Sequence, residues 1–302
     1  MPSQSNIVMT YIILVFIWAS TPLAIVWSVQ DLHLMWALVL RFFIALPVAA
    51  ALLWLLNIKF PFGRVAVYSY AAGALSLIGS QIFTYMATAY LSSGMIALMF
   101  GLAPIMAGLI GRFAFGHKLL GLQWLGMMVS LIGLALICLR AGGQHIQLTG
   151  IVLMLASVFV YSLSIFWVKK INADVAPMAQ ATGSILISTL AAICLLPLIW
   201  QYAPTHMPET RSLLALIYTI VMASLIAMFC YFKLVQNIQP TTLSLTTVMT
   251  PMLAMFLGSW LNHERLTFSV IIGVVFLLSG LFLYFYRDFK SSRELARRQS
   301  TL

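Results

Sequence analysis

Charged side chains are scarce in this sequence. Asp, Glu, Lys and Arg together make up 7% of its 302 residues, whereas hydrophobic residues make up 63%. An ordinary soluble domain carries about 25% charged residues, because it needs them to cover its surface. The shortage of charge excludes a water-soluble globular protein. It predicts an integral membrane protein, whose length is counted in membrane crossings of about 20 apolar residues each.

The sequence also lacks the motifs of metal, cofactor and catalytic sites. Its three cysteines, Cys138, Cys194 and Cys230, lie inside apolar runs without metal-ligand spacing, so a zinc site or a disulfide framework is not expected. The five histidines are scattered over different loops, and no phosphate-binding loop is present. We therefore expect no metal, no cofactor and no ATP hydrolysis, and we rank an integral-membrane enzyme acting on lipid as a low alternative.

Long apolar runs are what the sequence contains instead. Breaks with turn or helix-stop residues divide these runs into ten segments of membrane-crossing length. The sequence thus predicts an all-α membrane protein with ten transmembrane helices, at residues 7–28, 34–56, 66–90, 94–113, 119–139, 148–168, 176–199, 212–234, 243–262 and 266–286.

Lys and Arg are spread thinly, mostly in short gaps between the apolar runs, so the net charge of +10 indicates membrane topology and not nucleic-acid binding. Cytoplasmic loops of membrane proteins carry an excess of these residues. With ten helices and both termini in the cytoplasm, twelve fall inside and three outside, and Arg41 is left within a helix. The basic tail, 289–302, is interpreted as an anchor touching anionic lipid or, less favoured, as a partner-binding patch.

The two halves of the chain resemble one another. A single offset brings a proline, a basic residue, a leucine and two glycines of the first half onto similar residues of the second, pairing Pro104 with Pro251, Lys118 with Arg265, Leu119 with Leu266, Gly126 with Gly273 and Gly133 with Gly280. Each half holds five expected helices, and an odd number forces the second half to insert upside down. We expect repeats at 1–143 and 144–288, inverted around a central cavity, with Pro104 and Pro251 as hinges or static kinks.

Short motifs in this order and spacing carry a resemblance to a known family. They are Trp18-Ala19-Ser20-Thr21-Pro22, Arg41-Phe42, Ala103-Pro104, Thr250-Pro251 and His263-Glu264-Arg265-Leu266. The chain resembles the drug/metabolite transporter superfamily, and within it the EamA type, over nearly its whole length. The resemblance implies a basket of helices one to four and six to nine, with helices five and ten to one side. It also implies a bacterial inner-membrane exporter of small metabolites, such as amino acids or related amphipathic compounds.

A transporter cavity is sensibly lined by aromatic and hydroxyl groups with few fixed charges. The candidates at suitable depth are Trp18, Ser20, Thr21, Gln81, Tyr85, Met99, Tyr161, Trp167, Tyr231, Thr246 and Thr247. The competing interpretation is structural, because buried Ser and Thr bond back to their own helix and aromatic residues near helix ends belong to the interfacial belt.

Arg41 is the sharpest single candidate, because a permanent cation about two turns into a membrane helix normally faces a partner or water. It either receives a substrate carboxylate through paired hydrogen bonds, or it reaches toward the outer surface or bonds to helix-end carbonyls. None of the six acidic residues lies in the middle of an expected helix. We therefore expect facilitated diffusion, or coupling through a group at the cavity edge such as Glu264. Direction of transport, and monomer against homodimer, stay open.

Overall fold

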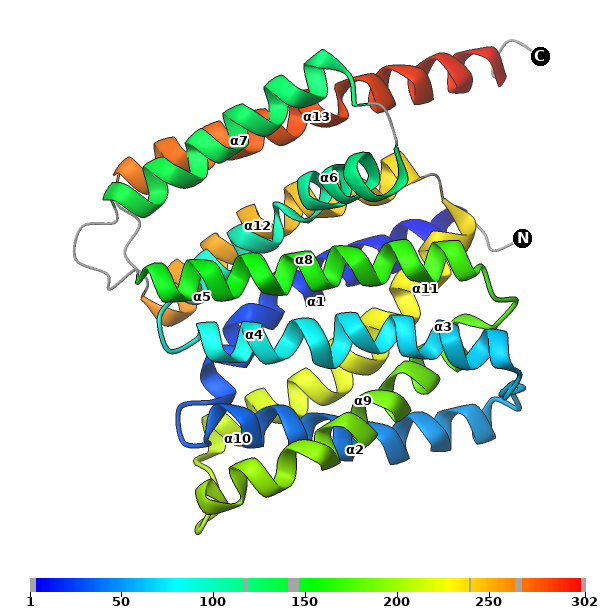
Figure 1. The fold of residues 1–302 in the computed structure, drawn as a ribbon, viewed down its shortest axis with the longest axis vertical. Helices are drawn as coiled ribbons and strands as arrows, with labels where there is room; N and C mark the ends of the chain where they lie inside the picture. The colour runs from blue at the N-terminus through cyan, green and yellow to red at the C-terminus, as the bar shows by residue number, and fades with distance from the viewer. Residues whose placement is uncertain (1–3, 117–118, 141–146, 239, 264–267, 300–302) are drawn as a thin grey trace.

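The computed structural model describes residues 4–116, 119–140, 147–238, 240–263 and 268–299. Within these ranges all regular structure is helical, with no strand. The helices run to and fro along one direction, and both ends of the chain lie at the same end of the molecule (Figure 1). The elements are α1 (Gln4–Ser28), α2 (Leu34–Leu55), α3 (Arg64–Ala74), η1 (Leu75–Gly79), α4 (Ser80–Ala87), α5 (Ser93–Phe100), α6 (Ala103–Phe115), α7 (Gly121–Arg140), α8 (Leu148–Ile171), α9 (Pro177–Ile199), η2 (Trp200–Tyr202), α10 (Thr210–Tyr218), η3 (Thr219–Ile226), α11 (Ala227–Asn237), α12 (Pro240–Asn262) and α13 (Phe268–Gln299).

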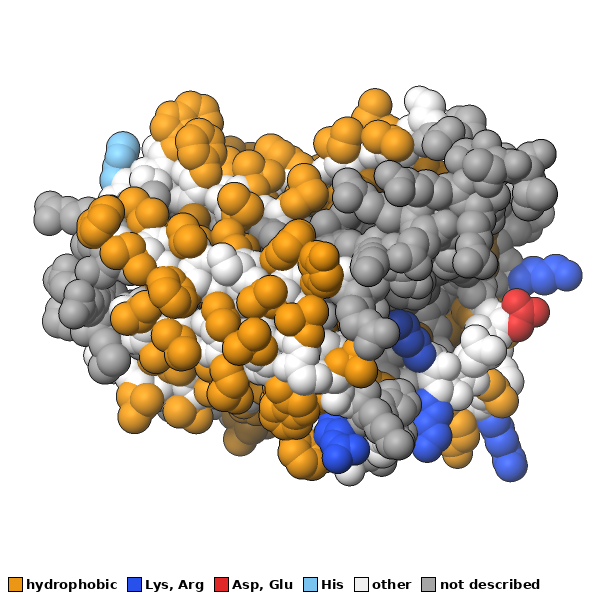
Figure 2. Space-filling view, turned by 90° about the horizontal axis from the view of Figure 1, so that it is seen from above, with side chains coloured by type: hydrophobic (Ala, Val, Ile, Leu, Met, Phe, Trp, Pro, Cys, Tyr) orange, Lys and Arg blue, Asp and Glu red, His pale blue; other side chains and the backbone are white. Residues whose placement is uncertain are grey.

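Seven helical segments of the described chain are long and apolar enough to cross a membrane, and two shorter apolar helices, Gly121–Ile137 and Ile271–Tyr286, add to them. Large hydrophobic side chains such as Trp54, Phe113 and Phe268 are exposed on the outside of the bundle. Figure 2 shows the same apolar cover on one face, with Lys and Arg gathered toward the end where the termini lie. An apolar outside is expected where lipid is the solvent.

The third and eighth expected helices, 66–90 and 212–234, are not regular throughout. Each contains a π-helical turn, η1 in the first and η3 in the second. With the local offset that places Tyr85 opposite Tyr231, the two turns fall at matching positions of the two halves. Such turns insert an extra residue into the helix and occur frequently at functional sites. Both π turns border the cavity described below.

The fourth expected helix, 94–113, is broken at its proline-containing segment. α5 ends at Phe100, and α6 begins at Ala103 with Pro104 in its first turn. Proline is tolerated there because the backbone N–H groups of the first turn have no acceptor within the helix, so its missing N–H costs no hydrogen bond. In the other half Pro251 lies inside the continuous helix α12. The two segments meet, because a Cβ built on Gly101 would lie 3.2 Å from the Pro251 ring. The two matching prolines thus differ in their helical position, Pro104 lying in the first turn of α6 and Pro251 inside α12, and their role as hinges or static kinks stays a prediction.

α7 and α13 pack against one another at one edge of the bundle (Figure 1). Their glycines pair crosswise: a Cβ on Gly126 would lie 2.6 Å from the carbonyl oxygen of Gly280, and one on Gly133 would lie 2.5 Å from that of Gly273. Between the pairs, Ser130 Oγ donates to the carbonyl of Leu277 at 3.0 Å. Small residues let helix backbones approach closely in lipid, where packing drives association.

Replacing Gly133 by alanine is expected to destabilise the protein by about 1–3 kcal/mol, the usual range for overpacking a tight contact. The added methyl group meets backbone atoms of α13, which cannot move aside as a side chain would. Gly121→Ala at the start of α7 is the matched control, because a Cβ there meets nothing within 4 Å. Thermal unfolding of the purified protein measures the difference. Equal melting temperatures for the two variants would contradict the close helix approach.

Candidate functional site

A cavity of ≈ 130 Å³ lies in the middle of the bundle. Residues from both halves of the chain line it: Trp18, Thr21, Pro22, Ile25, Arg41, Ser76, Leu77, Gln81, Ile96, Ala97, Phe100, Gly101, Ala103, Tyr161, Ala223, Met228, Thr250 and Pro251. Its wall is mostly apolar and aromatic, with a few hydroxyl and amide groups and one charged side chain. This composition is typical of a site for a small organic molecule.

Arg41 is the charged residue of the cavity, and it is 2% exposed. Its Nε donates to the hydroxyl of Ser224 at 2.8 Å, and its Nη1 donates to Oε1 of Gln81 at 3.4 Å. Ser224 lies in the π turn η3 and also donates to the carbonyl of Thr219, five residues earlier, while Gln81 is the second residue after the π turn η1. The two irregular turns thus position the acceptors that hold the guanidinium.

Three of the five N–H donors of Arg41 have no acceptor in the described part of the chain, and no carboxylate there pairs with its charge. A buried arginine without an anion is costly, so such a group normally faces a partner or water. Arg41 lies on the cavity wall, which places its remaining donors where a bound anion can reach them. This geometry favours the carboxylate-receiving interpretation of Arg41 over the one in which it reaches the outer surface.

A second, smaller pocket of ≈ 70 Å³ adjoins the cavity. The two share the wall residues Trp18, Ser76, Tyr161 and Met228, and the smaller pocket continues to Lys169 in the last turn of α8. That helix end lies at the end of the molecule where the chain termini are (Figure 1). The cavity therefore continues toward one end of the helices.

Polar contacts tie the helices together at the opposite end. The indole N–H of Trp27 on α1 donates to Oδ1 of Asn262 on α12 at 2.9 Å. The guanidinium of Arg211 on α10 lies 4.1 Å from the centre of the Trp27 ring, and Ser212 Oγ donates to the Trp27 carbonyl at 2.9 Å. These contacts close α1, α10 and α12 against each other on the side away from the termini.

Five of the residues expected at the site lie together on the cavity wall: Trp18, Thr21, Arg41, Gln81 and Tyr161. A sixth, Tyr231, lines the smaller pocket, where its ring lies 5.4 Å from that of Trp18. Thr21 Oγ1 donates to the carbonyl of Ile17 at 2.6 Å, so its hydroxyl hydrogen is already used within α1.

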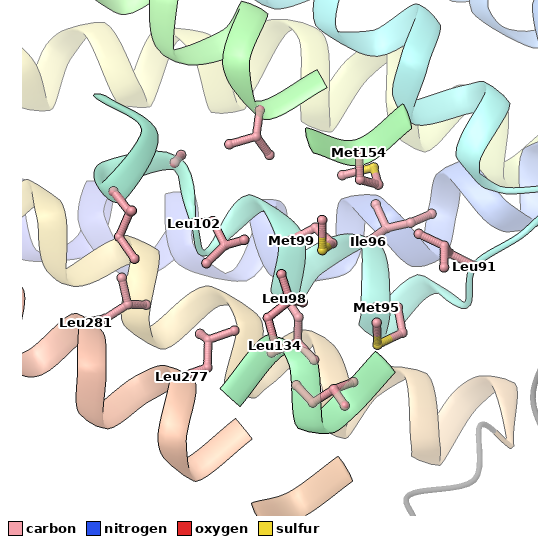
Figure 3. Packing of buried hydrophobic residues seen from close by; sticks show 14 of the residues in the cluster. Leu91, Met95, Ile96, Leu98, Met99, Leu102, Leu134, Met154, Leu277 and Leu281 are labelled. Atoms are coloured by element: carbon pink, nitrogen blue, oxygen red, sulfur yellow. The ribbon is translucent and has the colours of Figure 1, made fainter. Parts of the chain in front are cut away.

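Three other candidates lie away from both pockets. Tyr85 is fully buried among apolar side chains of α2, α4 and α9, and its hydroxyl has no hydrogen-bond partner among the residues that the structure describes. Met99 packs in the cluster with Leu98 and Met154 (Figure 3), because the break at Gly101 turns this part of α5 into the core. Trp167 is 48% exposed on the outer side of α8.

The remaining candidates fall into two groups. Ser20 forms a 2.6 Å hydrogen bond with Tyr218 of α10, and Thr246 is buried without lining either pocket. The side chain of Thr247 and the whole of Glu264 lie outside the described residues.

Several wall residues were not among the expected binding residues, and these include Ser76, Phe100, Met228 and Thr250. Phe100 packs edge-on against Tyr161, with ring centres 5.8 Å apart. Thr250 has a buried Oγ1 that finds no hydrogen-bond partner in the described part of the chain. Thr250 comes directly before Pro251, in a motif that carries the family resemblance. That motif could have identified Thr250 as a wall residue.

Comparison with known proteins agrees with the fold. The model of the EamA-like transporter family matches the chain twice, over residues 5–139 and 148–286. The chain belongs to the EamA-like transporter family. It is a multi-pass membrane protein of the drug/metabolite transporter type, in keeping with the seven membrane-length apolar segments of the described chain.

Several relatives carry transporter names. The uncharacterized inner membrane transporter YedA of Escherichia coli K12 is 27% identical over 259 residues, which cover 84% of this chain and 82% of that protein. A probable amino-acid metabolite efflux pump of the same organism is 23% identical over 205 residues, covering 63% and 67%. The uncharacterized transporter YvbV of Bacillus subtilis 168 is 20% identical over 195 residues, covering 64% of this chain and 63% of that protein.

One solved structure, a crystal structure of a protein with 18% sequence identity, superposes with a TM-score of 0.67 over 98% of this chain and 99% of the other. At this identity the similarity shows the fold alone. The coarse assignment, a membrane transporter, therefore rests on the family and its named members.

Proposed function

We propose that this protein is a secondary transporter that exports small amphipathic metabolites, amino acids or related compounds, across the bacterial inner membrane by alternating access. The observation that carries the proposal is Arg41: a buried cation on a central cavity wall, with donors free to bind an anion and no protein carboxylate beside it in the described chain. Aromatic side chains on the same wall suit the apolar part of such a molecule.

The proposed architecture is ten transmembrane helices in two inverted repeats, 1–143 and 144–288, followed by the basic tail 289–302. The crosswise glycine pairs of α7 and α13 support it, because the repeat offset exchanges one pair for the other. The matching π turns support it independently. The far end of α7 and the chain's C-terminus also lie at opposite ends of the molecule (Figure 1), as a five-helix repeat requires.

We place both termini in the cytoplasm, because described cations such as Lys59, Arg64, Lys169 and Lys170 lie at the termini's end, whereas Arg211 lies at the other. Single cysteines at Phe62 and Met207, both exposed, test this in a background without native cysteines. A membrane-impermeant maleimide added to whole cells is expected to label Met207→Cys and not Phe62→Cys. The reverse pattern would contradict the orientation.

Alternating access is supported by the unequal ends of the cavity. The termini's end continues through the smaller pocket to Lys169, and the other end is tied by the contacts of Trp27. This arrangement suits a state open toward the cytoplasm. Export is favoured by the name of the efflux-pump relative, and uptake of a similar solute is the alternative. No catalytic or cofactor role is part of the proposal.

Counterflow in proteoliposomes tests the carrier function. Amino acids, nucleosides and amphipathic carboxylates are first screened for their ability to raise the melting temperature of the purified protein. Liposomes loaded with an unlabelled hit are then expected to accumulate the labelled compound transiently above its outside concentration, because a carrier exchanges one molecule for another. Flux that only follows the gradient, as through a channel, would contradict alternating access.

A further inference from the structure

The charges that face the transport route have one sign. Arg41 is the only charged residue on the wall of the cavity, and Lys169 is the only one on the wall of the smaller pocket that continues it, as far as the described residues show. Lys233 lies elsewhere, with Nζ 3.4 Å from Oγ1 of Thr10 on α1. Among the acids whose side chains the structure describes, Asp31, Asp174 and Glu209 lie in the connections between helices.

Because the described charged residues along the route are all positive, they favour one of two kinds of carboxylate substrate, a monoanion over a zwitterion. A monoanion neutralises Arg41, and the occupied cavity then carries no net charge. A zwitterionic amino acid brings an ammonium group as well, which loses its water in the cavity and is repelled by Arg41. Burial of a charge without a partner of opposite sign is unfavourable, and no acid on the described wall supplies that partner.

The uncharged part of the wall fits an aromatic body. Trp18, Phe100 and Tyr161 present rings to the cavity, and Phe100 and Tyr161 hold each other in an edge-on arrangement. Aromatic faces attract cations, but here the same cation would be repelled by the nearby guanidinium. Thr250 also lines the cavity, and within the described residues its buried hydroxyl has no hydrogen-bond partner.

We propose that the preferred substrates are aromatic monocarboxylates without a free amino group, and not zwitterionic amino acids. The inference rests on the proposed transport function and narrows its substrate class. In such a molecule the carboxylate binds the free N–H groups of Arg41, and the ring packs among Trp18, Phe100 and Tyr161. Lys169 adds favourable potential for the anion along the route to the termini's end.

Four compounds that share a phenylethyl body and differ in their charged groups test the proposal. N-acetylphenylalanine is an anion, phenylalanine is a zwitterion, 3-phenylpropionate is an anion without the nitrogen, and phenethylamine is a cation. We expect proteoliposomes to exchange labelled N-acetylphenylalanine at least tenfold faster than phenylalanine. In detergent, 3-phenylpropionate is expected to raise the melting temperature of the protein more than phenylalanine does, and phenethylamine is expected to leave it unchanged.

Two results would overturn this assignment and are distinguishable. If phenylalanine is exchanged as fast as N-acetylphenylalanine and stabilises the protein as well as 3-phenylpropionate does, the anion preference is wrong and the transporter assignment stands. If none of the four probes stabilises the protein or is exchanged, while counterflow is found for an unrelated neutral or cationic solute, the role of Arg41 is wrong. Protein-free liposomes correct for passive leakage in every arm.

Discussion

Replacing Arg41 by methionine is expected to lower carboxylate binding by about tenfold to a hundredfold, because one hydrogen bond to a charged group contributes about 1.5–3 kcal/mol. Methionine has a similar length and keeps the apolar contacts of the stem. Its effect therefore reports the loss of the charged head, which Ser224 and Gln81 hold beside the cavity. Binding is measured by the concentration of 3-phenylpropionate that half-maximally stabilises the protein.

Stability is expected to change in the opposite direction. Replacing a buried charge by an apolar side chain of similar size is often neutral or stabilising, because the desolvation of the charge no longer opposes folding. The Arg41→Met protein should thus melt at the same temperature as the parent or higher. Arg41→Lys is the control that keeps the charge but loses the planar fork of donors, and it should bind at an intermediate level. Full binding by Arg41→Met would exclude the proposed role.

The second large effect is expected from Gln81→Glu, which changes one amide into a carboxylate of the same shape. The new carboxylate lies at the position of an oxygen now 3.4 Å from Nη1 of Arg41. It forms an ion pair with Arg41 and thereby competes with the carboxylate of the substrate, so substrate binding should fall at least tenfold. The pair also compensates a buried cation, so the melting temperature should rise.

Gln81→Met is the matched control for this variant, because it removes the bond to Arg41 without adding a charge. It should change carboxylate binding only a few-fold. If Gln81→Glu binds carboxylates as the parent does, Arg41 does not act as the anion receptor. If Gln81→Met and Gln81→Glu lose binding equally, Gln81 acts through its shape or its contact with the cargo and not through the charge of Arg41.

The position of Arg41 inside the bundle could be predicted from the sequence. A charge in lipid is costly whichever helices surround it, so its side chain was expected to face a partner or water. The same holds for the crosswise glycines of α7 and α13, whose seven-residue spacing marks one helix face. Helix positions were also predictable from the apolar runs. Most expected segments agree with the observed helices within a few residues.

The irregular turns were not predictable in the same way. Nothing in the composition of residues 75–79 or 219–226 distinguishes a π turn from an ordinary helical turn, since the extra residue is accommodated by packing with neighbouring helices. Side-chain direction depends on these turns. This is why Tyr85, although at suitable depth, points into a packed cluster, whereas Ser76 and Met228 reach the cavity.

The break before Pro104 shows a second limit. A proline in an apolar run is equally compatible with a kink in a continuous helix and with the first turn of a new one. Pro104 and Pro251 occupy matching positions of the two halves and take one option each. The choice is made by three-dimensional contacts, among them that of Gly101 with the Pro251 ring.

The most direct test of the central claim is a structure of the protein with 3-(4-bromophenyl)propionate bound, in which the anomalous signal of bromine locates the ring. We expect the bromine in the central cavity, with the ring among Trp18, Phe100 and Tyr161 and the carboxylate within hydrogen-bond distance of Arg41. Bromine on the outer surface, or a saturated complex in which no ligand atom lies in hydrogen-bond reach of Arg41, would contradict the account.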